Sequence, residues 1–384
     1  MTVAGCGSAP NLLFVGTNRG TNRRKAEHCD LEFDGLKGRT KNSSILRREP
    51  FRLQTLFMTA KAISLMSGGL DSVLATRLVL DQGVEVIGLH FISLLCNGIG
   101  ADKGGMAARA AVDLGIQLIV QDKGPGFLEL VKRPAHGYGK NMNPCIDCKV
   151  FMLRAASEVM RTEGASFVIT GEVLGQRPMS QMRRTISMIE KESGLVGQIL
   201  RPLSARLFPP SKPEQEGMVD RAKLLAISGR SRKEQYRLAE TYDIRAFGAP
   251  AGGCLLTDPV YSKKLADLLA QDEPFSMKDV ALLRVGRHFR INAIKLVLGR
   301  NKAENDWLSS FWSPPYTLVY PVFFKGPTGM FKGPIDQATM KIIMTIVASY
   351  SKDASRTVTL EFFDGRPRRE TGARLDIDIE SYGL

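Results

Sequence analysis

The chain has 384 residues, of which 43% are hydrophobic and 24% charged, and only six are cysteines. This is the balance of an ordinary globular protein of more than one domain. Six cysteines are too few for a disulfide scaffold, and no apolar run approaches the roughly 18 residues that a membrane-spanning helix needs. We therefore expect a cytoplasmic protein with no membrane association.

The formal net charge of +14 and the pI near 9.6 suggest a polyanionic partner, with nucleic acid first. An exposed basic tail without a partner would give the same totals. The position of the basic residues along the chain therefore matters more than their number.

Residues 1–57 show no sustained hydrophobic period, and Thr17 to Arg24 have no core-forming face. The segment lacks the apolar centre of a secretory signal, and its acidic residues argue against a transit peptide. We expect a disordered extension. Met58, just ahead of the first convincing strand, is a candidate for the biological start.

The organising motif is the segment Ser67-Gly68-Gly69-Leu70-Asp71-Ser72, which lies between a short apolar strand, 62–66, and a helical pattern, 73–80. A strand, a glycine-rich loop and a helix N-terminus together form a cradle for phosphate, since unpaired N–H groups and the helix dipole favour an anion. The spacing is neither that of a Walker loop nor G-x-G-x-x-G. The alternative is a glycine-rich turn that binds nothing.

Strand and helix patterns alternate after this motif, with strands at 84–91 and 116–120 and a helix at 106–114. This predicts an α/β fold, a doubly wound parallel sheet with helices on both faces. A nucleotide would then lie beyond the carboxyl ends of the strands, at the topological switch point. His90 ends the second strand, where it would either contact the nucleotide or serve a structural role.

Two cysteines, Cys145 and Cys148, form a C-x-x-C pair directly before a predicted helix, 149–163, and Cys254 follows in a glycine-rich turn. Thiols at a helix start are favoured as thiolates, which suits nucleophiles and metal ligands. A further strand, 166–170, leads into a loop that includes Gly171 and Gln176 and should face the same nucleotide crevice.

The C-terminal part, 271–384, predicts a smaller α+β domain. Between 284 and 302 it carries six Lys or Arg residues and no carboxylate. We interpret this basic segment as a surface for RNA phosphates, although an ordinary solvated face would have the same composition.

With these residues identified, the segment from about 58 to 270 resembles the PP-loop tRNA thiolation enzymes, both the 4-thiouridine synthase type and the 2-thiouridylate synthase type. Residues 284–305 are similar to the RNA-binding module of the NFACT proteins. The resemblance implies an adenine nucleotide alpha hydrolase-like fold for 58–270 and RNA binding for 271–384. Neither a THUMP-type domain nor a rhodanese loop with a persulfide cysteine is recognisable.

The resemblance implies an ATP-dependent tRNA sulfurtransferase that adenylates a uridine carbonyl, releases pyrophosphate and replaces the oxygen by sulfur. The implied catalytic residues are Asp71, Cys145, Cys148 and Cys254. The implied ligands of ATP and Mg²⁺ are Ser67, Gly68, Gly69, Asp71, Ser72, His90, Gly171 and Gln176.

The three thiols have two functional interpretations. They could ligate a 4Fe-4S cluster with one open iron, the interpretation that we favour, or one could carry a persulfide that a partner thiol resolves. Inert thiols are the third alternative. Expected partners are tRNA and a sulfur donor, either sulfide or a persulfide carrier protein, and a homodimer is an allowed state. Competing functions are a PP-loop amidotransferase or sulfur-inserting enzyme acting on a small molecule, and a non-catalytic RNA-binding adaptor.

Overall fold

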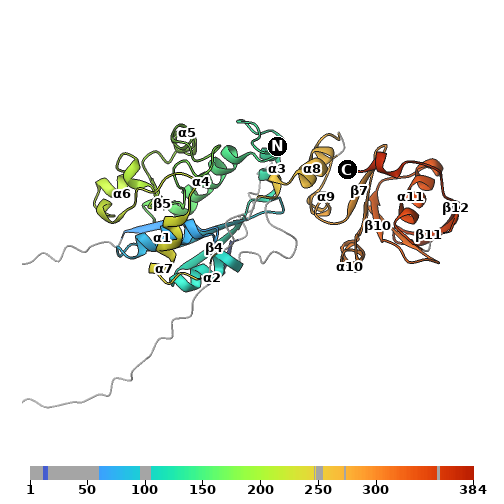
Figure 1. Ribbon diagram of the computed structural model, residues 1–384, viewed down its shortest axis with the longest axis horizontal. Helices are drawn as coiled ribbons and strands as arrows, with labels where there is room; N and C mark the ends of the chain where they lie inside the picture. The colour runs from blue at the N-terminus through green and yellow to red at the C-terminus, as the bar shows by residue number, and fades with distance from the viewer. Residues whose placement is uncertain are drawn as a thin grey trace, which may run out of the picture.

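The computed structural model describes residues 12–15, 60–95, 105–245, 247, 254–271, 274–352 and 355–384. The chain forms two sheets, each with its own helices, joined by a short helical bridge (Figure 1). The first belongs to the predicted doubly wound domain and the second to the predicted C-terminal α+β domain, so both predictions are confirmed. No helix in the described residues is both long enough and apolar enough to cross a membrane.

The first sheet has six strands in the order β1-β4-β3-β2-β5-β6. The strands from β4 to β6 are parallel, and β1 joins antiparallel to β4. Their bounds are β1 Leu12–Val15, β2 Lys61–Leu65, β3 Glu85–Ile92, β4 Gln117–Asp122, β5 Phe167–Ile169 and β6 Ile199–Leu200. The expectation of disorder throughout residues 1–57 is wrong for β1. The rest of that segment, and Met58, lie outside the described residues.

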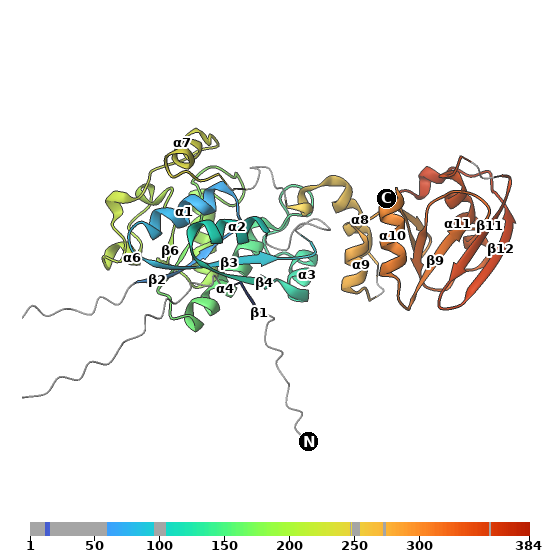
Figure 2. The same cartoon turned by 90° about the horizontal axis from the view of Figure 1, so that it is seen from below.

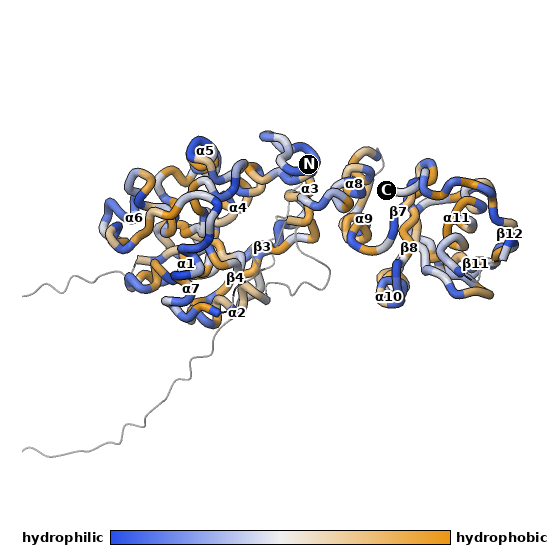
Figure 3. The backbone as a smooth tube through the Cα atoms, in the orientation of Figure 1, coloured by the Kyte–Doolittle hydropathy of each residue, from blue (hydrophilic) through white to orange (hydrophobic). Residues whose placement is uncertain are grey.

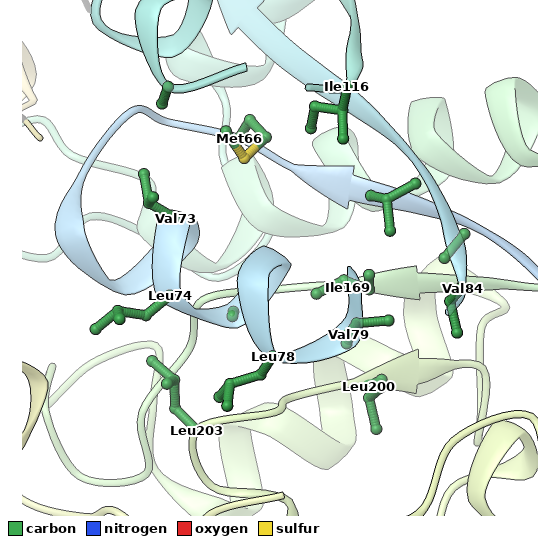
Figure 4. Packing of buried hydrophobic residues seen from close by; sticks show 14 of the residues in the cluster. Met66, Val73, Leu74, Leu78, Val79, Val84, Ile116, Ile169, Leu200 and Leu203 are labelled. Atoms are coloured by element: carbon green, nitrogen blue, oxygen red, sulfur yellow. The ribbon is translucent and has the colours of Figure 1, made fainter. Parts of the chain in front are cut away.

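Helices cover both faces of this sheet because its strands alternate apolar side chains between the two sides. Ala62 and Ile169 face α1 (Leu70–Leu80) and α2 (Gly105–Leu114), with α7 (Lys233–Thr241) beyond them. Figure 4 shows Val79 of α1 next to Ile169 of β5, in the same cluster as Leu74. Ile63 and Val168 face the other side, against α4 (Cys145–Thr162) and α5 (Arg183–Ser193).

The switch point lies between β2 and β5. The chain leaves β2 through α1 toward β3 and β4, whereas β5 pairs with the opposite edge of β2. The loops after β2 and after β5 therefore diverge to opposite faces, which opens a crevice at their carboxyl ends. The predicted phosphate loop is the first of these two loops.

A helical bridge connects the two sheets (Figure 2). Its elements are α3 (Gly124–Lys132), η3 (Leu255–Thr257), α8 (Pro259–Leu269) and α9 (Met277–Leu282), which share one hydrophobic cluster around Phe127, Leu256 and Leu265. In chain order, β6 and α7 are separated by the short elements η1 (Ala205–Leu207), α6 (Lys212–Gln215) and η2 (Arg221–Lys223).

The second sheet is antiparallel throughout, in the order β12-β11-β9-β10-β8-β7. Its bounds are β7 Arg287–Ile291, β8 Ile294–Leu298, β9 Tyr316–Pro321, β10 Gly329–Lys332, β11 Thr357–Phe363 and β12 Pro367–Ala373. One face packs on α11 (Gln337–Ser349), and the other packs in part on α10 (Lys302–Phe311). The final turn is η4 (Ile379–Tyr382).

An ion cluster fastens the bridge to the second sheet. Asp267 of α8 accepts two hydrogen bonds from Arg290 at 2.7 and 2.9 Å and one from Lys295 at 2.9 Å. Burial opposes ionisation of Asp267, but these cations lower its pKa overall. Because all three side chains are largely buried, a neutral residue at 267 would leave two cations without their counter-charge.

We predict that Asp267→Asn lowers the free energy of unfolding by about 3 kcal/mol, the usual cost of removing one member of a buried ion pair. Urea unfolding followed by circular dichroism measures it. The matched control is Asp306→Asn, which breaks an exposed pair with Lys302 on α10 and should leave the free energy of unfolding nearly unchanged. Equal effects of the two variants would show that the Asp267 cluster does not stabilise the bridge.

Candidate active site at the carboxyl edge of the parallel sheet

The loop after β2 has the shape of a phosphate cradle. Gly68 adopts a φ of +74°, and a Cβ there would lie 2.6 Å from the backbone nitrogen of Ala107 in α2. Only glycine suits both the backbone angle and this approach. Gly69 caps α1, so the loop ends on the positive end of a helix dipole.

The two serines of the loop are already ordered by local hydrogen bonds. The Ser72 hydroxyl donates to the carbonyl of Gly69 at 2.8 Å and lies 3.2 Å from the Ser67 hydroxyl. The backbone N–H of Gly69 donates to Ser67 Oγ at 3.3 Å. The predicted ligands Ser67, Gly68, Gly69 and Ser72 are thus gathered around one helix start, as an anion site requires.

Asp71 joins this loop to the loop after β5. Its Oδ2 accepts a hydrogen bond of 2.7 Å from Gln176 Nε2 and lies 3.7 Å from Arg232 Nε. The side-chain oxygen of Gln176, Oε1, in turn accepts a hydrogen bond of 3.1 Å from Nε2 of the fully buried Gln235. The side-chain amide of Gln176, which we expected to contact the nucleotide, is therefore occupied by Asp71 and Gln235. We call these two hydrogen bonds the Gln176 brace. The other carboxylate oxygen, Asp71 Oδ1, is buried and has no hydrogen-bond partner among the described residues.

The buried Asp71 Oδ1, which has no donor among the described residues, is where a magnesium ion would bind. A buried carboxylate oxygen without a donor is costly unless a cation or a polar ligand meets it. Carboxylate oxygen is also a preferred Mg²⁺ ligand, usually completed by substrate phosphates and water. Asp71 therefore fits the predicted Mg²⁺.

Gly171 has a packing role at this point. A Cβ on Gly171 would lie 2.6 Å from the carbonyl carbon of Asp71 and from the nitrogen of Ser72. The loop after β5 therefore rests directly on the backbone of the phosphate loop. The predicted contact with nucleotide remains a prediction, but the need for glycine follows from this close approach.

A buried ion network lies under the same loop. Glu172 pairs with Lys149 of α4 and with Arg201, whose Nε is 2.9 Å from Glu172 Oε2, and Arg201 also pairs with Glu190. Burial disfavours the charged carboxylate, but the two cations outweigh it and lower the pKa of Glu172 from 4.5 to about 2. The network fixes the start of α4 relative to the loop.

The C-x-x-C pair lies in the first turn of α4. The predicted helix began at Lys149, but the observed helix begins at Cys145, just after Pro144, which belongs at a helix start. The two thiols differ in their surroundings: Cys145 Sγ lies 3.3 Å from the Ser180 hydroxyl, and Cys148 Sγ lies 3.2 Å from the Lys123 ammonium. Both thiols thus lie at a helix N-terminus, and Cys148 has a cation beside it, whereas Cys145 has a hydroxyl.

Cys254 reaches the same region from η3. The backbone N–H of Met142 donates to Leu256 at 3.2 Å, and the Asn141 side chain donates to Thr257 at 2.7 Å, so the segment after Cys254 is held on the segment before Cys145. Cys148 and Cys254 both pack against the hydrophobic cluster of the bridge. Within the described residues, however, no three His, Cys, Asp or Glu side chains form a group that could hold a metal ion. As placed, the thiols do not fit the predicted 4Fe-4S cluster.

His90 contacts the backbone just before the phosphate loop. Its Nδ1 is 2.7 Å from the carbonyl oxygen of Met66, the residue before Ser67. Burial lowers the pKa of His90, and the Lys123 ammonium adds to this shift, while the bond to Met66 opposes it. A neutral ring at physiological pH suits the structural alternative. Lys123 therefore interacts with both His90 and the Cys148 thiol.

The predicted basic surface at 284–302 is largely neutralised. Arg290 and Lys295 pair with Asp267, Arg300 with Glu304, and Lys302 with Asp306. Arg287 stacks over the ring of Tyr350, 4.6 Å from its centroid. Neighbouring carboxylates from 267, 304 and 306 therefore offset a segment that contains none itself.

Two family models match separate parts of the chain. Residues 57–206 match the family model described as "Thiamine biosynthesis protein (ThiI)", and residues 286–373 match "NFACT protein RNA binding domain". The first part of the chain is thus similar to the ThiI family, and the last part is similar to the NFACT RNA-binding domain. This confirms the family resemblance expected for both parts.

Curated relatives match part of the chain. A "Probable tRNA sulfurtransferase" of Methanosarcina mazei is 34% identical over 129 residues, which cover 30% of this chain and 29% of the relative. The "tRNA-specific 2-thiouridylase MnmA" of Frankia alni is 30% identical over 167 residues, covering 39% and 46%. The chain thus spans less than half the length of these relatives. Among solved structures, a 4-thiouridine synthetase–RNA complex with bound ATP is 22% identical, with a TM-score of 0.32 and coverage of 59% and 52%.

Several residues of the site carry no recognisable local signal in the sequence. Lys123, Arg201 and Gln235 stand in ordinary polar positions, and only their contacts across the fold reveal them. Lys149 and Glu172 lie next to predicted site residues and could have been chosen for that reason. Their pairing, however, spans 23 residues.

We predict that Gly171→Ala abolishes most ATP binding, because the added methyl group would displace the backbone of Asp71 and Ser72. Isothermal titration with ATP and Mg²⁺ measures the loss, which should be at least about tenfold. Gly126→Ala in α3, where a Cβ meets open space, is the control. ATP binding by Gly171→Ala at the level of Gly126→Ala would contradict the role given to this contact.

We also predict that Glu172→Gln costs about 3 kcal/mol of unfolding free energy at neutral pH, since it leaves Lys149 and Arg201 short of a buried counter-charge. Because the folded-state pKa lies below that of the unfolded chain, this stabilisation is complete above about pH 4.5 and disappears as the pH falls toward 2. Urea unfolding across this range should show a steeper loss for the natural protein than for the variant. The control, Glu158→Gln in an exposed pair on α4, should behave like the natural protein.

Proposed function

We propose that the protein is an ATP-dependent tRNA sulfurtransferase that converts a tRNA uridine into a thiouridine. The proposal depends on one observation: Lys123 interacts both with the Cys148 thiol and with His90, which contacts the residue before the phosphate loop. Lys123 lies 3.2 Å from Cys148 Sγ and close to His90, which bonds to the phosphate loop at Met66. The named relatives, described as tRNA sulfurtransferases and a 2-thiouridylase, support the choice of tRNA.

In the first step, the uridine carbonyl oxygen attacks the α-phosphorus of ATP, and the bond to pyrophosphate breaks. The start of α1 and the hydroxyls of Ser67 and Ser72 would hold the leaving pyrophosphate through hydrogen bonds and the helix dipole. Asp71 Oδ1 would hold Mg²⁺, which when bound neutralises charge on the phosphates. The brace from Gln176 to Asp71 keeps that carboxylate in one orientation.

In the second step, sulfur takes the place of the activated oxygen. If sulfide is the donor, HS⁻ adds to the activated carbon, AMP leaves with the former carbonyl oxygen, and one proton is released. If a persulfide carrier is the donor, the terminal sulfur of a Cys148 persulfide bonds to that carbon as AMP leaves. The Cys254 thiolate then attacks Cys148 Sγ, which releases thiouridine and leaves a disulfide for an external dithiol to reduce.

The placement of the thiols favours the persulfide route over the cluster. The Lys123 ammonium stabilises a thiolate at Cys148, and Cys254 packs against the same hydrophobic cluster. The 4Fe-4S alternative would require the three thiols to converge on one point.

We predict that Asp71→Asn lowers tRNA-dependent pyrophosphate release by about 100-fold, the usual scale for losing one group that stabilises developing charge. Cys148→Ser should release pyrophosphate normally but form no thiouridine, as measured by mass spectrometry of tRNA nucleosides. The exposed Asp113→Asn on α2 is the control and should match the natural protein.

Three results would overturn the proposal. Equal pyrophosphate release with and without tRNA would favour a small-molecule substrate. No pyrophosphate release under any condition would favour the RNA-binding adaptor. Undiminished thiolation by Asp71→Asn would show that the active site lies elsewhere.

A further inference from the structure

One face of the C-terminal sheet is only half covered. Along β11, Val358, Leu360 and Phe362 are buried against α11, while the alternating residues on the other side are half-exposed. The neighbouring edge strand β12 is exposed and mostly hydrophilic along its length (Figure 3). In Figure 1, α10 lies on the β10 side of this domain, away from the β11–β12 hairpin. We call the uncovered part of β9, β11 and β12 the open face.

Strand register places its side chains in rows. Tyr320 of β9 stands opposite Glu361 of β11, which stands opposite Arg369 of β12. The next row contains Leu318, Phe363 and Pro367. An aromatic ring and an exposed guanidinium therefore share one solvent-facing surface.

Further aromatic side chains border the open face where α10 ends. Trp312 contacts Phe363 with ring centroids 4.8 Å apart, and Trp307 stacks on Phe311 at 4.3 Å. These rings and Tyr320 are only partly buried on the cluster beneath α10. Phe323, just beyond β9, is 80% exposed. Such rings would be a liability on a surface that met only water.

The charges on this face suit a polyanion. Arg369 pairs with Glu361 at 3.0 Å but remains 64% exposed, and Arg366 in the hairpin is exposed. The NFACT-type domain has a modest excess of 16 Lys and Arg over 13 Asp and Glu between 271 and 384. Since its predicted basic segment is mostly ion-paired, phosphate contacts alone would not give strong binding there.

We propose that the open face binds an unpaired segment of RNA, with bases stacked on Trp312 and Tyr320 and phosphates near Arg369. Proteins recognise unpaired RNA by stacking bases on aromatic rings of a sheet surface, and each stacked base contributes about 1–3 kcal/mol. This inference rests on the proposed function, which supplies tRNA as the molecule bound. It assigns recognition of the unpaired segment to a surface far from the ATP loop.

The two tryptophans of the chain both lie on α10 or at its end, so intrinsic fluorescence reports on this surface directly. We expect a single-stranded oligoribonucleotide or unmodified tRNA to quench the emission of the full-length protein, and an RNA duplex without unpaired ends to quench it far less. Trp312→Phe should remove most of the quenching, and Trp307→Phe should retain it. RNA binding with unchanged emission would overturn the proposal.

The variant Tyr320→Ala should weaken RNA binding about tenfold for the stacked base that is lost. The control is Tyr350→Ala, a partly exposed tyrosine at the end of α11, where it packs on Phe289. Circular dichroism confirms that each variant is folded. An equal loss of binding in the control would overturn the proposal, while quenching that persists in a protein unable to thiolate tRNA would overturn only the proposed function.

Discussion

The carboxyl edge of the parallel sheet depends on one close contact between two loops. Gly171 rests on the backbone of Asp71 and Ser72 at a distance that no Cβ would allow. This contact occurs where neighbouring strands β2 and β5 send their connections to opposite faces. The Gln176 brace then holds Asp71 across the same gap. The glycines of the phosphate loop determine its backbone shape, but the loop after β5 orients the Asp71 carboxylate through Gln176.

A buried charge network extends this arrangement to the thiols. Glu172, the residue after Gly171, pairs with Lys149 in the first two turns of α4 and with Arg201 after β6. Any shift of the loop would therefore move the start of α4, which carries Cys145 and Cys148. Desolvation makes this network costly unless every partner is present. It consequently favours one relative placement of the nucleotide cradle and the thiols.

The bridge between the sheets serves both sides. Its hydrophobic cluster includes Cys148 of the parallel-sheet domain, while Asp267 pairs α8 with Arg290 and Lys295 of the C-terminal sheet. The segment after Cys254 begins this bridge and is hydrogen-bonded to the segment before Cys145. Cys254 thus lies next to the helices that lead to the C-terminal domain, so the positions of that domain and of Cys254 are set together.

The sequence by itself determined the features that depend on local spacing. The glycine-rich loop, the alternation of strands and helices, the C-x-x-C pair and the two family resemblances were all predictable, since each depends on residues close together in the chain. The strand at Leu12–Val15 was not, because four residues form a strand only when β4 offers them an edge.

The tertiary structure decided which side chains meet. Gln176 bonds to Asp71, and Lys123 contacts Cys148. The basic segment at 284–302 pairs with carboxylates that lie outside it in the sequence. Electrostatic and hydrogen-bonding partners act over a few ångströms, while the residues concerned lie from a few to more than a hundred positions apart. Local pattern therefore identified the kinds of groups, and the fold decided their pairing.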